Sequence, residues 1–162
     1  MKTEMGELIV GAYLKQIEEC DFVEYNVRTR GGGLKGLNEL DVVGLNFVTN
    51  TAYLCEVTTH LLGALYVDNR STVEKIKTKH ENQKYYALNY LTSFQNIRYM
   101  FWSPYVPVGY ITKGLAEVTD LELIINKEYT NRINEMRLLA KKTTNDTGND
   151  FFRALQILEH LK

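Results

Sequence analysis

The chain has 162 residues, of which 44% are hydrophobic and 24% are charged, as in an ordinary globular protein. This length predicts one domain over residues 1–162. The formal net charge of −1 argues against a generic polybasic nucleic-acid binder, but a local basic groove is compatible with it. No apolar run approaches the roughly 18 residues that span a bilayer, and the N-terminus lacks the apolar core of a signal peptide. We therefore expect a cytoplasmic protein without a membrane partner.

The first half of the chain predicts one helix followed by three strands. Apolar residues recur at helical spacing near the start, and β-branched and aromatic segments separated by turn residues follow. The helix is expected over 4–19 and the strands over 22–30, 37–48 and 52–59, with a glycine turn at 31–36. The last two strands flank a short polar turn and form a hairpin signature.

The second half begins with the clearest helix of the chain and continues with strands and helices. The long helix is expected over 73–94, opening at "NRST" with Glu74 in its first turn, and segment 97–111 supplies a strand, a break marked by proline and room for a second short strand. A strand over 121–126 and helices over 127–142 and 150–161 complete the order. The sequence therefore predicts an α/β domain with a central mixed β-sheet flanked by helices.

Three acidic residues occupy positions where a carboxylate is costly. Asp41 interrupts the apolar run "NELDVVG", Glu56 lies in the next strand, and Glu7 is on the apolar stripe of the first helix. If the two strands pair as a hairpin, alternation can place Asp41 and Glu56 on one face of the sheet, although the sequence does not fix their register. The alternative for each strand acid is simple exposure to solvent.

Converging carboxylates repel one another, and a divalent cation relieves that repulsion. Mg²⁺ suits such a site because it binds through one or two carboxylates while keeping several waters. A cation held there can activate water for attack on a phosphodiester.

The order of these acids resembles the PD-(D/E)XK nuclease superfamily, which has the restriction-endonuclease-like fold. The resemblance rests on a helix with Glu7, then "ELD" ending in Asp41, then "CEVT" containing Glu56, then a long helix. It implies that Asp41 and Glu56 bind Mg²⁺, with Mn²⁺ as a substitute, and that Glu7 joins or orients the site. It also implies cleavage of nucleic acid, most readily DNA, and many such nucleases pair, so a homodimer is one expectation.

The long helix extends the resemblance to RecB-like members of the superfamily. Its segment "NQKYYALNYL" carries Gln83 and Tyr86 in the manner of their "QxxY" helix. The resemblance implies that Gln83 lies near the catalytic carboxylates and supports them.

One position departs from the family pattern. Where the superfamily has a lysine two positions beyond the strand glutamate, this chain has Thr58, which cannot supply a positive charge. Either the lysine has moved, with Lys35, Lys75, Lys77 and Lys79 as candidates, or the site has decayed and the fold serves binding. Lys79 lies one turn before Gln83 on the same helix face.

Basic residues near the first acid suggest how nucleic acid could be held. Arg28, Arg30 and Lys35 flank the glycine turn before Asp41 and could contact backbone phosphates; a solvated loop is the alternative. We thus expect a Mg²⁺-dependent DNA endonuclease. A catalytically inactive nuclease-fold module that binds DNA or a protein is the second hypothesis, and an unrelated α/β domain with structural acids is the third.

Overall fold

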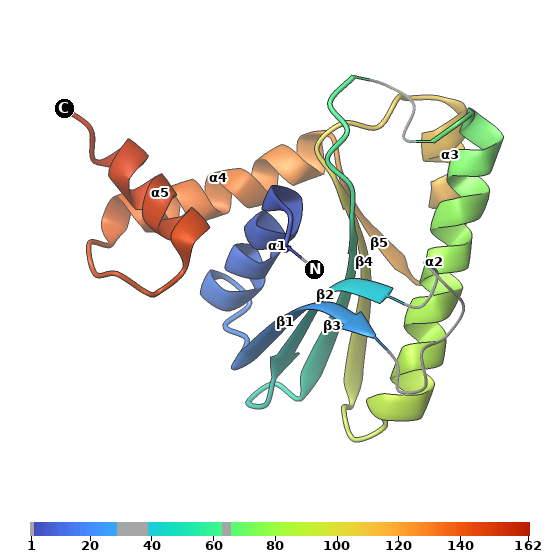
Figure 1. Ribbon diagram of the computed structural model, residues 1–162, viewed down its shortest axis with the longest axis horizontal. Coiled ribbons are helices and arrows are strands. Elements are labelled where there is room, and N and C mark those ends of the chain that lie inside the picture. Colours follow the sequence, from blue (N-terminus) through green and yellow to red (C-terminus); the bar gives the residue numbers. More distant parts are fainter. Residues whose placement is uncertain (1, 29–38, 63–65) are drawn as a thin grey trace.

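A computed structural model describes residues 2–28, 39–62 and 66–162, which form an α/β domain with one five-stranded sheet and five helices. Figure 1 shows the sheet between helix α1 on one side and helix α2 on the other. The elements in chain order are α1 (Met5–Gln16), β1 (Phe22–Arg28), β2 (Glu39–Asn46), β3 (Thr51–Val57), α2 (Asn69–Tyr90), β4 (Asn96–Ser103), α3 (Tyr110–Ala116), β5 (Leu121–Ile125), α4 (Lys127–Lys142) and α5 (Asp150–Glu159).

The sheet is mixed, as the sequence predicts, and its strands follow one another in chain order from β1 to β5. Strands β1, β2 and β3 are antiparallel, whereas β4 and β5 run parallel to β3. The parallel pairing of β3 with β4 requires a crossover, which helix α2 provides. The β2–β3 hairpin thus places these strands side by side, with α2 returning over them.

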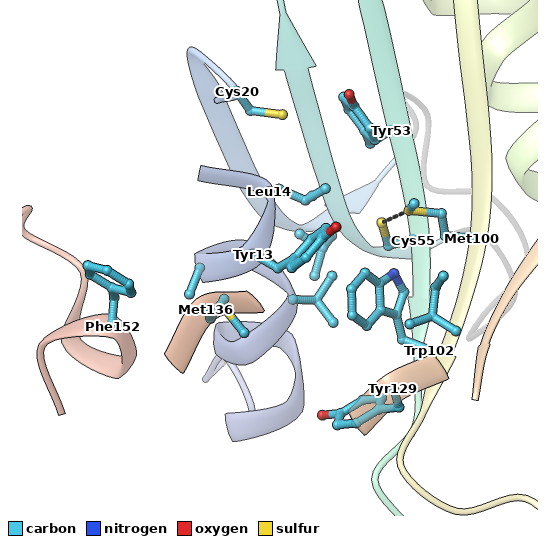
Figure 2. Close-up of a cluster of buried hydrophobic side chains, with 14 of the residues drawn as sticks. Tyr13, Leu14, Cys20, Tyr53, Cys55, Met100, Trp102, Tyr129, Met136 and Phe152 are labelled. Carbon is cyan, nitrogen blue, oxygen red and sulfur yellow. Dashed lines mark hydrogen bonds between the residues drawn. The ribbon is translucent and has the colours of Figure 1, made fainter. Parts of the chain in front are cut away.

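The largest apolar core lies between the sheet and helices α1, α4 and α5. Figure 2 shows Tyr13 of α1 against Trp102 of β4, with Met136 of α4 and Phe152 of α5 in the same cluster. The Tyr13 and Trp102 ring centroids are 5.1 Å apart. Both free cysteines, Cys20 and Cys55, are buried here. The side chains of this cluster therefore fix α1 on the face of the sheet opposite α2.

Helix α2 runs along β3 with matched spacing. Lys79 contacts the Glu56 side chain, and Gln83 donates to the Leu54 carbonyl. Moving four residues along the helix, from 79 to 83, therefore matches moving two residues along the strand, from 56 to 54. Both steps are about 6 to 7 Å long. Ala87 and Ala52, one step further, lie in one buried cluster with Leu54. This register determines which α2 side chains meet the strand acids.

Two sequence predictions in this region were wrong. Helix α2 begins at Asn69 rather than 73, because the Asp68 side chain accepts a hydrogen bond from Ser71 N–H as an N-cap; Glu74 is therefore not in its first turn. The second short strand, for which segment 97–111 left room, does not form: residues 104–109 have no strand and helix α3 begins at Tyr110. Its Ile111 and Leu115, one turn apart, are buried in a cluster with residues of α2, and this packing overrides local β-propensity.

Candidate metal and phosphodiester site

Asp41 of β2 and Glu56 of β3 lie next to each other on the face of the sheet that α2 covers. The strands pair with Val43 opposite Leu54 and Val42 opposite Cys55, and continuing this register places Asp41 opposite Glu56. The Asp41 Oδ2 atom accepts a hydrogen bond of 2.8 Å from the Val57 N–H. The two acids predicted to share a face therefore do so, and the backbone of β3 holds the Asp41 carboxylate in place.

Lys79 reaches both acids from helix α2. Its Nζ atom lies 2.5 Å from Glu56 Oε2 and 3.8 Å from Asp41 Oδ2. Burial alone would lower the pKa of Lys79, but Glu56 and Asp41 raise it above the usual value, so the ammonium stays charged. The site thus contains a lysine beside the strand acids, although position 58 does not supply it.

The Glu56 side chain is only 3% exposed. Burial, and then the neighbouring charge of Asp41, raise the pKa of Glu56 to about 8, against the opposing effect of Lys79. Its Oε1 atom is buried and has no hydrogen-bond partner among the described residues. A buried acceptor normally finds a partner, so this oxygen has unused capacity to bind a cation.

Glu7 lies near this pair but is held by other groups. Its Oε2 atom accepts hydrogen bonds from the Glu4 N–H at 2.9 Å and from Asn26 Nδ2 at 3.4 Å. Burial raises the pKa of Glu7, the Glu4 N–H opposes that shift, and the charge of Asp41 raises it further. Glu7 is therefore close enough to Asp41 for their charges to interact, while its Oε2 atom is held by Glu4 and Asn26.

Asn26, which the sequence did not single out, distorts β1 beside the site. The β1–β2 pairing has Tyr25 opposite Val42 and Val27 opposite Leu40, so Asn26 faces Asp41. Its φ of 52° is left-handed, a conformation that asparagine tolerates better than most residues. This bend lets the Asn26 amide reach Glu7 from an edge strand.

Gln83 is fully buried but makes no direct contact with the carboxylates. Its Nε2 atom donates to the carbonyls of Leu54, at 2.9 Å, and Met100, at 3.2 Å. Gln83 therefore ties α2 to β3 and β4 one helical turn away from Lys79. Next to it, His80 is buried with its two ring nitrogens 3.0 Å from Gln83 Oε1 and 2.8 Å from Asp120 Oδ1. No metal-ligand spacing marked His80 in the sequence.

Thr58, Lys75 and Lys77 have contacts other than the strand acids, and Lys35 lies outside the described residues. The Thr58 backbone N–H donates to Trp102 O. Lys75 Nζ lies 4.0 Å from the ring centroid of Tyr66, while Lys77 pairs with Glu117 at 3.9 Å. Of the candidates in the described ranges, Lys79 is the one that meets the carboxylates.

The basic residues expected to hold phosphates are only partly described. Arg28 is exposed and pairs with Glu39 of β2 at 3.0 Å, so its charge is already partly neutralised. Arg30 and Lys35 lie outside the described residues. The interface predicted for these three side chains stays a prediction.

The carboxylates of the site supply some, but not all, of the ligands that a divalent cation needs. No group of three or more His, Cys, Asp or Glu side chains within residues 2–28, 39–62 and 66–162 gathers closely enough for a metal site. Asp41 and Glu56 supply two acidic ligands, which is the number that Mg²⁺ commonly takes from protein when waters and phosphate complete its shell. The unpartnered Glu56 Oε1 fits this use.

Comparisons with known proteins give no family: no protein-family model matches the chain, and no curated protein or solved structure is significantly similar to it. None of the helices in the described ranges is both long and apolar enough to cross a membrane.

Proposed function

We propose that this protein is a metal-dependent nuclease of the restriction-endonuclease-like fold that cleaves phosphodiester bonds in DNA. One observation carries the proposal: a lysine from α2 lies 2.5 Å from a strand glutamate, whose other oxygen is buried and finds no partner within residues 2–28, 39–62 and 66–162. The order of one helix, an antiparallel three-stranded unit, a crossover helix and a parallel strand supports the same fold.

Asp41 and Glu56 would hold Mg²⁺, which when bound would offset negative charge on the phosphodiester and lower the pKa of water. The Val57 N–H keeps the Asp41 carboxylate oriented. Lys79, which stays charged, presents ammonium protons at the edge of the site, where they can donate to a phosphate oxygen or to the attacking water. Glu7 adds negative charge near Asp41, which favours a cation there.

Cleavage assays with Mg²⁺ or Mn²⁺ test this proposal. Supercoiled plasmid, linear duplex, single-stranded DNA and RNA should each be incubated with wild type and with Asp41→Asn, in which the amide oxygen can still accept from the Val57 N–H. We expect metal-dependent cleavage of DNA by wild type and its loss in the variant. Glu74→Gln, an exposed acid on α2 that pairs with Arg70, is the matched control and should cleave normally. Equal cleavage by Asp41→Asn, or none by wild type, would refute the proposal.

A second function, a nuclease-fold module that binds without cleaving, is favoured by one observation. Thr58 occupies the motif-lysine position, and the Lys79 ammonium beside Glu56 and Asp41 offsets negative charge there without a metal. Calorimetric titration of Mn²⁺ separates the two: saturable binding that Asp41→Asn abolishes supports the enzyme, whereas no binding to wild type supports the module.

A further inference from the structure

A chain of hydrogen bonds crosses from the surface of the protein to the strand that carries Glu56. The two carbonyls of Leu54 and Met100 can only accept, so the nitrogen of the Gln83 amide must face them. Its oxygen, Oε1, then faces His80 Nδ1 at 3.0 Å. Because an amide oxygen is also only an acceptor, His80 Nδ1 must carry a proton.

The other nitrogen of His80 meets an acceptor too. His80 Nε2 lies 2.8 Å from Asp120 Oδ1, and the hydrogen bond from His80 lowers the pKa of Asp120 below its usual value, so the acid is ionised at neutral pH. The His80 side chain is 2% exposed, which leaves no room for water to mediate either contact. Both ring nitrogens must therefore donate, and His80 is an imidazolium.

The charged groups around His80 can accommodate the positive charge of an imidazolium. Asp120 precedes β5 and also lies 3.7 Å from Lys84 Nζ. Lys84 is itself paired with Glu81, at 2.9 Å, on the exposed side of α2. From β4, the Tyr99 ring meets the His80 ring edge-on, with centroids 5.2 Å apart. Asp120 is thus the acid that directly contacts the imidazolium.

Loss of one proton from His80 would disturb more than its own contacts. If Nδ1 lost its proton, two acceptors would face each other at Gln83, and the amide could recover the bond only by rotating. Rotation would turn its oxygen toward the Leu54 and Met100 carbonyls and break the contacts that hold α2 on β3. Lys79 is one turn from Gln83 and meets Glu56 two residues from Leu54, so its position depends on those contacts.

We propose that Asp120, His80 and Gln83 are positioning residues for the candidate site: a doubly protonated His80 fixes the Gln83 amide, which fixes α2 on β3 and sets the reach of Lys79 to Glu56. The chain begins at Asp120, whose side chain is 47% exposed, so a charge change at the surface is transmitted to the site. The role in catalysis rests on the proposed nuclease function, whereas the protonation of His80 and the position of Lys79 do not.

Imidazole ¹⁵N spectroscopy at neutral pH tests the protonation directly. The His80 signals are identified by their loss in His80→Gln. We expect two protonated ring nitrogens in wild type and in Glu81→Gln, which neutralises an acid next to His80 in sequence without contacting its ring. In Asp120→Asn, whose side-chain amide can donate to an unprotonated nitrogen, we expect one ring nitrogen to lose its proton. One unprotonated nitrogen in wild-type His80 would overturn the proposal whether or not the protein cleaves DNA.

Chemical modification of Lys79 tests the positioning. Reductive methylation followed by peptide mass mapping should modify Lys79 several-fold faster in Asp120→Asn than in wild type, with the exposed Lys77 as internal reference and unchanged. If cleavage is confirmed, Asp120→Asn should lower kcat while KM and Mn²⁺ affinity stay within twofold, and the pH profile of kcat should change. Unchanged Lys79 reactivity in a folded Asp120→Asn protein would refute the positioning role, and absence of cleavage would refute only the nuclease.

Discussion

The ammonium of Lys79 lies 2.5 Å from Glu56 Oε2, although the two residues are 23 positions apart in the chain. This contact joins the crossover helix to the central strand, and it also places Lys79 3.8 Å from Asp41. The positive charge beside the strand acids thus comes from the helix, because position 58 of the chain is a threonine. The chemistry of the site then depends on how α2 is held, which makes the helix part of the candidate site.

Replacing Lys79 by methionine should reduce cleavage without unfolding the protein. The substitution keeps an unbranched side chain of similar length but removes the charge, and loss of such a group typically costs about 10²-fold or more in rate. Mn²⁺ binding should persist, because Asp41 and Glu56 are unchanged. Single-turnover cleavage and calorimetry measure the two effects.

The control for this prediction is Lys77→Met on the same helix. Lys77 is 43% exposed and pairs with Glu117, so its replacement should leave cleavage within about twofold. Equal losses of cleavage in Lys79→Met and Lys77→Met would mean that cleavage depends on the total charge of the helix rather than on the contact between Lys79 and Glu56.

Metal affinity should rise with pH until about pH 8. Because burial and Asp41 raise the pKa of Glu56 to about 8, a cation must displace its proton below that pH. One displaced proton corresponds to about a tenfold change in affinity per pH unit. Titrations of Mn²⁺ in buffers of different ionisation enthalpy give both the affinity and the number of protons released.

Glu56→Gln provides the comparison for that titration. The variant has no proton to release at this position and loses a ligand, so any residual binding should be weak and should depend little on pH. Affinity in wild type that stays constant between pH 6 and pH 8 would contradict an uncharged Glu56 in the metal-free protein.

Without metal, the folded protein should lose stability as pH rises from 4.5 to about 8. The ordinary pKa of Glu56 is 4.5 and its folded value is about 8, so within this window the unfolded chain has released a proton that the folded chain still binds. Stability therefore falls with pH, by an amount on the order of a few kcal/mol. Glu56→Gln should flatten this dependence, as measured by urea unfolding in the presence of EDTA.

Glu74→Gln should leave the pH dependence unchanged, because Glu74 is exposed and pairs only with Arg70. If the free energy of unfolding changed with pH equally in wild type and in Glu56→Gln, groups other than Glu56 would govern the pH dependence between pH 4.5 and pH 8.

At Asn26, glycine should be tolerated better than alanine. The left-handed φ of 52° costs a residue with a Cβ about 1 kcal/mol or more relative to glycine, and both variants lose the bond to Glu7 equally. Asn26→Gly should therefore be more stable than Asn26→Ala by about 1 kcal/mol in urea unfolding.

Asn134 offers the opposite case, because it is exposed within helix α4. There alanine should be more stable than glycine by about 1 kcal/mol. If the alanine variant were the more stable one at both positions, the backbone at Asn26 would not be constrained to a left-handed conformation.

The placement of the strand acids could be predicted from the sequence because it depends on local alternation. Asp41 and Glu56 share a face once the hairpin forms, and Lys79 and Gln83 share a helix face by their spacing of four. Helix α3 could not be predicted, because its Ile111 and Leu115 are buried by α2, a distant part of the chain. The contact between His80 and Asp120, 40 positions apart, likewise leaves no local pattern.

The matched spacing of α2 and β3 also restricts how the helix can slide. A displacement by one helical turn would bring Gln83 opposite Glu56 and move Lys79 beyond the end of the strand. The buried side chains of α2 include Ile76, His80, Gln83 and Ala87, which differ in size and polarity, so the shift would also disturb their packing and hydrogen bonds. Above about pH 8, where Glu56 is ionised, its buried carboxylate would then face a neutral amide and lose its cation, a change that costs several kcal/mol. The contact between Glu56 and Lys79 therefore reinforces a single alignment of α2 on β3.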